Sequence, residues 1–268
     1  MAMQIDSSAP SPYPLLTPDS LAASSPALPA VTQQTALFLD FDGTLVEIAS
    51  QPELVQVPKN LVDTLRHLAG RLDGALAIVS GRRLADLDGF LAPLLLPAAA
   101  EHGAVQRLSS DRTLHFATPD LHDIARVALA LAAQHAGLHV EIKSAAIALH
   151  YRHAPGLETL CLETMAEAVK RTPGVDLMQG KCVVEIKPAG VSKGTAIQSF
   201  MSLPPFAGRV PVFAGDDTTD EAGFTAVQAM GGQGIKVGAG DSLAEHRCAS
   251  PARLRQWLQS AFEERTGA

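Results

Sequence analysis

The most informative stretch of the sequence is Ala36-Leu37-Phe38-Leu39-Asp40-Phe41-Asp42-Gly43-Thr44. Four apolar residues followed by two carboxylates predict a buried strand that delivers acidic groups to its C-terminal end, where parallel α/β sheets bind ligands. Asp40 and Asp42 lie two residues apart on an extended backbone, so they can hold a hard cation, or one of them can attack an electrophile. Gly43 allows a sharp turn, and Thr44 offers a hydroxyl and an amide to an anion. A turn with solvated acids is the alternative for this pair taken alone.

Strand and helix signals alternate after residue 35 and again near the C-terminus. Helical patterns follow Pro58 and cover 84–91, and Ser192 and Ser250 are placed to cap two later helices. The expected core strands are 36–39, 75–79, 98–100, 210–214 and 235–237. This order predicts an α/β fold with a doubly wound, Rossmann-like parallel sheet.

The pattern changes between the two halves of this core. Residues 113–187 read as helix, two strands, helix, two strands, with the helices at 120–136 and 157–171. Strand pairs after helices predict an inserted α+β module with a partly antiparallel sheet. We therefore expect a core made of 34–112 and 188–268. Residues 1–33 are rich in Ser, Pro and Ala and are expected to form a disordered leader.

Composition narrows the classes of function. The chain has 268 residues, 47% hydrophobic and 18% charged, with a net charge of −7. This balance is typical of a globular enzyme and argues against nucleic-acid or anionic-membrane partners, so an anionic ligand needs a local cation. Three cysteines without CxxC spacing favour a reduced, cytoplasmic protein. No apolar run is long enough to span a membrane, and we expect a monomer.

Polar groups stand at several of the predicted strand ends and at one helix start. They are Asp40, Asp42, Ser80, Lys193, Asp216, Asp217 and Asp220. These positions share one edge of a parallel sheet. Clustered carboxylates need compensation, which Mg²⁺ supplies while bridging to phosphate oxygens. With Lys193 as a fixed charge and Ser80 as a donor, the set predicts phosphoryl transfer. Taken singly, Ser80-Gly81-Arg82 is a turn, Lys193 a solvated residue and 215–221 a helix cap.

The combination resembles the haloacid dehalogenase superfamily of phosphatases, through Asp-x-Asp-Gly-Thr at 40–44, Ser80, Lys193 and Gly-Asp-Asp-x-Thr-Asp-Glu at 215–221. The resemblance implies that Asp40 is the nucleophile and forms an aspartyl-phosphate. It implies that Asp42 is the general acid and then the base. Ser80 and Lys193 would bind phosphoryl oxygens. Asp40, the backbone carbonyl of Asp42, and Asp216 would hold Mg²⁺, with Asp217 or Asp220 in support.

A closer similarity, over about residues 36–262, is to the trehalose-6-phosphate phosphatase family. It rests on the segments 99–104, 148–152, 180–188 and 215–221. The family resemblance implies hydrolysis of trehalose 6-phosphate in trehalose biosynthesis, and an inserted module that acts as a cap over the disaccharide.

A neutral, hydroxyl-rich sugar needs side chains that both donate and accept. The candidates for substrate binding are, in the inserted module, Glu141, Lys143, His150, Arg152, Lys181 and Glu185, and in the core Gly43, Thr44, Gly81, Arg82, Glu101 and His102. Lys181 and Glu185 are the strongest, since they occupy a turn and the adjoining strand. Alternating charges on a half-buried strand pair also fit a solvated face.

Three other functions share these core residues. A related phosphatase for sucrose phosphate or a mannosyl phosphate differs only in the inserted module. In a phosphomutase or phosphotransferase, a sugar hydroxyl replaces water. A phosphosugar-binding regulator without turnover does not need the nucleophile, so the presence of Asp40, Asp42, Lys193 and Asp216 argues against it.

Overall fold

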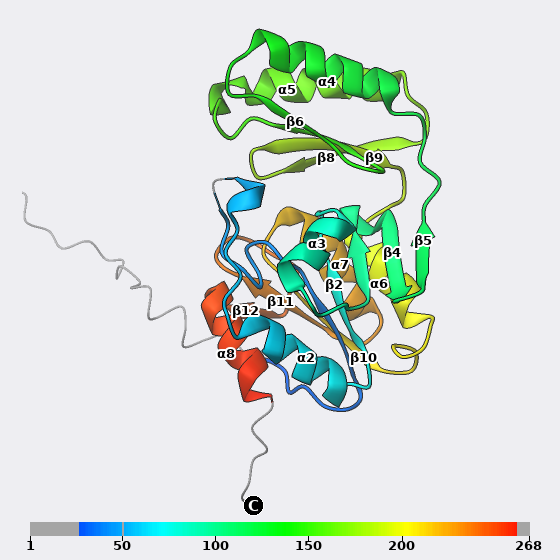
Figure 1. The fold of residues 1–268 in the computed structure, drawn as a ribbon, viewed down its shortest axis with the longest axis vertical. Helices are drawn as coiled ribbons and strands as arrows, with labels where there is room; N and C mark the ends of the chain where they lie inside the picture. Colours follow the sequence, from blue (N-terminus) through cyan, green and yellow to red (C-terminus); the bar gives the residue numbers. More distant parts are fainter. Residues whose placement is uncertain (1–26, 50, 262–268) are drawn as a thin grey trace, which may run out of the picture.

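The computed structural model describes residues 27–49 and 51–261, and their strands form two sheets. Figure 1 shows the larger sheet with its helices in the lower part of the view and the smaller sheet above it, beneath two long helices. The chain passes from the lower part to the upper part after β5 and returns after β9. The predicted α/β core with an inserted α+β module is confirmed.

The core sheet has eight strands in the order β12-β11-β10-β1-β2-β3-β4-β5. Their bounds are β1 Thr35–Leu39, β2 Leu76–Val79, β3 Ala98–Ala100, β4 Val105–Ser109, β5 Arg112–His115, β10 Val210–Gly215, β11 Gln233–Val237 and β12 His246–Cys248. The six strands β12 to β3 are parallel, and β4 and β5 are antiparallel. Because the chain leaves β1 toward β2 and returns on the other side at β10, the ligand crevice is expected beyond the end of β1.

The core packs helices against a strand that is buried throughout. All five residues of β1 are buried, and Phe38 stacks on Phe206 and tilts against Phe200. The helices are α2 Leu61–Arg71, α3 Leu84–Leu91, α6 Lys193–Met201, α7 Glu221–Ala229 and α8 Pro251–Ser260, with short 3-10 turns η1 Pro52–Leu54, η2 Glu101–Gly103 and η4 Thr218–Asp220. Ser192 caps α6 in a capping box with Thr195, and Ser250 caps α8, as predicted.

The inserted module is a four-stranded sheet, β6-β7-β9-β8, covered by α4 and α5. Its elements are α4 His122–Gln134, β6 His139–Ile142, β7 Ile147–His150, η3 Pro155–Leu157, α5 Glu158–Lys170, β8 Val175–Gly180 and β9 Val183–Pro188. The sheet is wholly antiparallel, not partly so. Ile147, Leu149, Val184 and Ile186 pack with residues of the two helices, so the alternate residues form the sheet's other face, toward the core.

Three features differ from the sequence predictions. The hairpin of β4 and β5 was not predicted, because β5 is exposed along its whole length and carries no apolar alternation. Helix α2 begins at Leu61, three residues after Pro58. The predicted leader lies outside the described residues up to residue 26, but Leu28 packs on the core and Trp257 Nε1 donates to the Pro29 carbonyl at 3.1 Å. None of the helices within 27–49 and 51–261 is long and apolar enough to cross a membrane.

Candidate active site

Asp40 lies at the centre of the site, immediately after β1. It is 3% exposed, and its two carboxylate oxygens have different partners. Lys193 Nζ donates to Oδ1 at 2.7 Å, and Thr44 Oγ1 donates to Oδ2 at 3.1 Å. Burial, joined by the charges of Asp220 and Asp216, raises the pKa of Asp40 despite the opposing charge of Lys193. Asp40 is therefore oriented by its partners and needs more positive charge than Lys193 provides.

Asp220 organises the loop that follows β10. Its side chain is fully buried; Oδ1 accepts from Lys193 at 2.6 Å, and Oδ2 accepts from the backbone N–H groups of Asp216 and Asp217, each at 2.9 Å. Burial opposes the charge of Lys193, but Asp220 and Asp40 outweigh it and raise the pKa of the ammonium. Asp217 caps η4 and is only half-buried. Of the two predicted supporting residues, Asp220 is the one bonded into the centre.

A cluster of three carboxylates could hold a cation. Oxygens of Asp40, Asp216 and Asp220 lie within 4.8 Å of one another. Burial, followed by the charge of Asp220, raises the pKa of Asp216 to about 7. Oxygen donors that are this close and this hard to ionise fit a divalent cation. This set contains the Asp220 side chain and not that of Asp42, for which the family resemblance invokes only the backbone carbonyl.

Gly43 lets the loop after β1 approach Asp216 closely. Its φ is +73°, and a Cβ atom at this position would lie 2.1 Å from Asp216 Oδ2. Thr44 is buried, and its hydroxyl donates a hydrogen bond to Asp40. Gly43 and Thr44 therefore help to position the carboxylates of the cluster, and neither residue lines the cleft.

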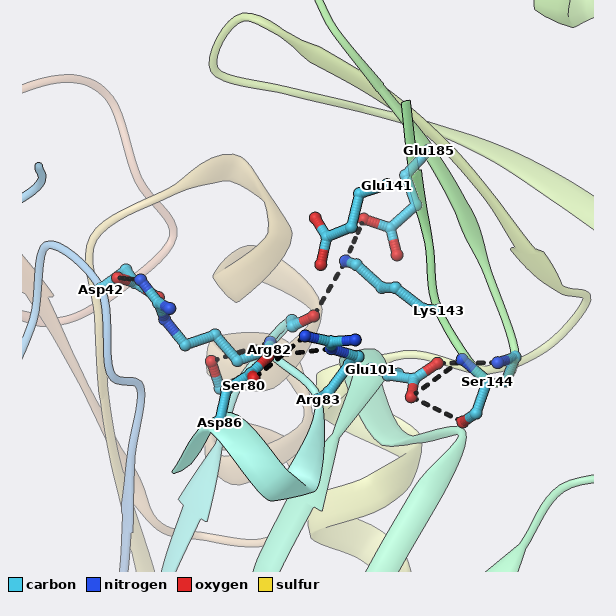
Figure 2. A network of polar contacts seen from close by, with 12 residues as sticks. Asp42, Ser80, Arg82, Arg83, Asp86, Glu101, Glu141, Lys143, Ser144 and Glu185 are labelled. Atoms are coloured by element: carbon cyan, nitrogen blue, oxygen red, sulfur yellow. Dashed lines mark hydrogen bonds and ion pairs between the residues drawn. The ribbon is translucent and has the colours of Figure 1, made fainter. Parts of the chain in front are cut away.

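Asp42 is paired with Arg82 across the mouth of the site. Arg82 Nε donates to Asp42 Oδ2 at 2.6 Å and Nη2 to Oδ1 at 2.7 Å, which is a bidentate pair (Figure 2). The guanidinium also lies 4.8 Å from the centre of the Phe90 ring and 5.7 Å from that of Phe41. Arg82 is therefore preorganised, and it holds the side chain that is expected to move the proton.

The turn 80–82, which follows β2, packs against the core. The Ser80 side chain is buried, and its Oγ accepts from Arg82 N at 3.2 Å. A Cβ atom on Gly81 would lie 2.4 Å from His102 Nε2, so only glycine allows the imidazole to approach so closely. Ser80 thus lies at the same edge of the sheet as Asp40, as expected for parallel neighbouring strands.

The inserted module contributes a second polar cluster, centred on the buried Glu185 of β9. Lys143 Nζ donates to Glu185 Oε2 at 2.9 Å, and His102 Nε2 lies 3.5 Å from the same oxygen. Burial opposes the charge of Glu185, but Lys143 and His102 outweigh it and lower its pKa to about 2. Burial lowers the pKa of His102. Glu185 Oε1 is buried and has no hydrogen-bond partner among the described residues, so the cluster contains one unsatisfied acceptor.

Strands β6 and β7 add further polar groups beside this cluster. His150 Nε2 lies 3.1 Å from Glu141 Oε2, and the ring of His139 lies 5.9 Å from that of His150. Arg152 and Lys181 are exposed, and Arg152 Nη2 donates to the Lys181 carbonyl at 3.4 Å. These groups occupy the face of the sheet turned toward the core.

A cleft of about 1070 Å³ separates the two clusters. Most of the predicted site residues line it: Asp40, Asp42, Ser80, Gly81, Arg82, His102, Glu141, Lys143, His150, Arg152, Lys181, Glu185, Lys193, Asp216 and Asp217. Glu101 differs from its expected role, because both of its oxygens accept from Ser144 and Ala145 and it does not line the cleft.

Sequence reasoning missed three groups near the cleft. His139 lines it, and its spacing of two from Glu141 on one strand was the available signal. Lys236 donates to the backbone carbonyl of Asp216, and Ser144 donates to Glu101. Neither lysine nor serine carries a sequence signal for these contacts, since both depend on the tertiary arrangement.

The sequence matches one protein family over most of its length. The family model described as trehalose-phosphatase matches residues 38–256. The chain belongs to the trehalose-phosphatase family. It is 44% identical to trehalose-6-phosphate phosphatase of Escherichia coli (strain K12), covering 86% of this chain and 88% of that protein. It is 43% identical to a probable trehalose-phosphate phosphatase of Sinorhizobium fredii, over 76% of this chain and 77% of that one.

Two solved structures share the fold of this chain. A trehalose-6-phosphate phosphatase related protein superposes with a TM-score of 0.69 at 29% identity, covering 84% of this chain and 95% of that chain. The C-terminal domain of Candida albicans trehalose-6-phosphate phosphatase superposes with a TM-score of 0.76, over 86% and 92%. At 22% identity, the second similarity shows the fold alone.

Proposed function

We propose that this protein hydrolyses trehalose 6-phosphate to trehalose and inorganic phosphate through a phosphorylated Asp40. The observation that carries the proposal is a single cleft with two unlike walls. One wall is the buried cluster of Asp40, Lys193 and Asp216, which suits a phosphoryl group, and the other is the polar cap face around Glu185, which suits sugar hydroxyls.

The chain's own residues supply the chemistry. Lys193 and Thr44 fix the two oxygens of Asp40, so the carboxylate is held in one orientation for attack on phosphorus. The bond from Asp40 to phosphorus forms as the bond from phosphorus to the sugar oxygen breaks, and Asp42 gives its proton to that oxygen. Asp42 then takes a proton from the water that hydrolyses the aspartyl-phosphate. Both steps require Asp42 to release one of its two bonds to Arg82, because an oxygen that carries the proton cannot also accept from the guanidinium; Asp42 takes up its first proton from solvent on this release.

We propose Mg²⁺ as the cation of the site. Asp40 and Asp216 would hold it, with Asp220 positioning both Lys193 and the backbone of Asp216. When bound, Mg²⁺ supplies charge compensation and orients the phosphoryl oxygens. EDTA should abolish phosphate release and excess Mg²⁺ should restore it; full activity in EDTA would contradict the assignment.

We assign recognition of the sugar to the cap, with Lys181 and Glu185 as its main contacts. The cap face offers both donors and acceptors, as a neutral disaccharide requires. Lys181→Ala and Glu185→Ala should each reduce kcat/KM for trehalose 6-phosphate about tenfold or more, with a smaller loss on p-nitrophenyl phosphate, because only the sugar substrate loses a hydrogen bond to a charged side chain. Equal losses on both substrates would contradict this role.

Phosphate release from a panel of sugar phosphates, with Asp40→Asn as the inactive control, tests the function. Preference for trehalose 6-phosphate supports it, whereas preference for sucrose phosphate or a mannosyl phosphate would overturn the substrate assignment. Transfer to a sugar hydroxyl in place of phosphate release would indicate a phosphomutase or phosphotransferase. We also propose a cytoplasmic monomer. Its three free cysteines suit a reducing compartment, and light scattering tests the oligomeric state.

A further inference from the structure

All three carbonyls of the turn 80–82 accept hydrogen bonds, and their donors come from both parts of the molecule. The Ser80 carbonyl accepts from His102 N and the Arg82 carbonyl from Glu101 N, each at 2.9 Å. Between them, the Gly81 carbonyl accepts from Lys143 Nζ of the cap, also at 2.9 Å (Figure 2). The turn that carries Ser80 is thus held by the core on either side and by the cap in the middle.

Glu101 connects the same turn to the cap through its side chain. Glu101 is 2% exposed. Oε1 accepts from Ser144 Oγ at 2.6 Å and from Ser144 N at 3.3 Å, and Oε2 accepts from Ala145 N at 2.7 Å. These three donors belong to the turn between β6 and β7, so a core carboxylate closes off the end of a cap hairpin (Figure 2).

The backbone around Glu101 is held in an uncommon conformation. Glu101 and His102 have φ values of 49° and 56°, and Gly103 follows at 110°. Non-glycine residues occupy this left-handed region at a cost, and they persist there where surrounding contacts fix them. A Cβ atom on Gly103 would lie 3.0 Å from the Ser192 carbonyl, at the start of the helix that carries Lys193. Residues 101–103 therefore touch the turn 80–82, the cap hairpin and α6 at once.

Lys143 connects the turn held by Glu101 to Glu185 in the cleft. It directly precedes Ser144, its side chain is 6% exposed, and its ammonium bridges Glu185 and the Gly81 carbonyl. Because Glu101 fixes residues 144 and 145, it also fixes the backbone from which the Lys143 side chain extends. We propose that Glu101 is a positioning residue: it holds the β6–β7 turn against the turn 80–82, so that Lys143 keeps Glu185 in place in the lining of the cleft.

This inference rests on the proposed function, in which Glu185 binds the sugar. It makes Glu101 a determinant of selectivity between substrates. Glu101→Gln keeps the shape of the side chain but has one acceptor oxygen, so its amide nitrogen must face an N–H donor. A phosphate ester without a sugar does not use Glu185, so its turnover needs the Asp40 cluster but not the placement of Lys143.

The test compares kcat/KM for trehalose 6-phosphate and for p-nitrophenyl phosphate in the full chain. Glu101→Gln should lower the ratio of the first to the second about tenfold, as the loss of one buried charge-assisted hydrogen bond would. Asp88→Asn is the matched control: it weakens the ion pair with Arg107, neither residue lines the cleft, and the ratio should stay unchanged. An equal loss on both substrates, or none on either, overturns the proposal.

A double variant separates positioning from a merely structural role. If Glu101 acts through Lys143, Glu101→Gln should lower the ratio by less than about twofold in a Lys143→Met background. A further tenfold fall there overturns the proposal. If Glu101→Gln does not fold, Ser144→Ala carries the test, since it removes one donor and keeps two backbone donors; it should lower the ratio about threefold.

The wild type provides the check on the underlying function. If it hydrolyses a different sugar phosphate in preference, the proposed substrate is wrong. The same ratio measured with that sugar phosphate then still decides the role of Glu101.

Discussion

Replacing Gly43 by alanine perturbs the carboxylate cluster with a single methyl group. The new Cβ atom would lie 2.1 Å from Asp216 Oδ2, 2.3 Å from Cγ and 2.7 Å from Oδ1, where ordinary contact begins near 3.4 Å. The carboxylate must therefore move by more than about 1 Å. The backbone of Asp216 cannot follow easily, because Asp220 holds its N–H and Lys236 its carbonyl.

The expected magnitude has two parts, one for stability and one for activity. An alanine at φ +73° costs about 1–2 kcal/mol in the left-handed region, whatever space surrounds it. Displacing Asp216 by about 1 Å misplaces a proposed cation ligand, and misplacements of that size reduce turnover on the order of 100-fold. The loss should fall on trehalose 6-phosphate and p-nitrophenyl phosphate alike, because both need the phosphoryl site.

Gly208→Ala is the matched control for this experiment. Gly208 has φ +79° and nothing within 4 Å of a Cβ atom, so alanine there carries the same backbone cost without the clash. Urea unfolding should show similar losses of stability in the two variants. Phosphate release should show a loss of activity and a raised Mg²⁺ requirement in Gly43→Ala alone. If Gly43→Ala keeps activity within a few-fold of Gly208→Ala, the close approach to Asp216 does not matter for the site.

Two further perturbations test the electrostatics. Asp220→Ala leaves Lys193 with Asp40 as its partner and removes the acceptor of two partly buried backbone N–H groups, so urea unfolding should show a loss of roughly 2–4 kcal/mol; a loss below about 1 kcal/mol would contradict this role. The folded-state pKa of Glu185 is lowered to about 2, so its ionisation contributes stability that is present above the unfolded pKa and lost as pH falls toward 2. The stability advantage of wild type over Glu185→Gln should therefore shrink by about 2 kcal/mol between pH 6 and pH 3, and a pH-independent difference would show that Glu185 is not held ionised.

The sequence predicts the core well because its signals are local. Apolar runs that end in polar residues identify β1, β2 and β10, and parallel pairing then brings Asp40, Ser80 and Asp216 to one edge. Ser192, as the N-cap residue, predicts the start of α6 and hence the position of Lys193. Each of these inferences needs only the period of the pattern and the direction of the strands.

No local sequence signal predicts which side chains pair with each other across the cleft. Glu101 and His102 stand side by side in the sequence, yet the Glu101 carboxylate binds the cap turn while the His102 ring faces Glu185. The left-handed backbone at both residues separates the directions of the two side chains, and nothing in their residue types predicts it. Arg82 was expected to face the substrate. It lines the cleft, but its guanidinium is also paired with Asp42 and lies over the Phe90 ring, contacts that no local signal predicts.

The charge balance of the site explains why these partners are arranged as they are. Asp40, Asp216 and Asp220 bring three negative charges to the cluster. Two ammonium groups face them, Lys193 and the Lys236 that donates to the Asp216 carbonyl, so the fully ionised cluster lacks one positive charge. The pKa of Asp216, raised to about 7, expresses this deficit. Arg82 and Lys143 cannot supply the missing charge, because Asp42 and Glu185 already engage them. A divalent cation held by the cluster would remove the deficit without disturbing either pair, and the phosphate dianion of a substrate would then meet a cluster that no longer repels it.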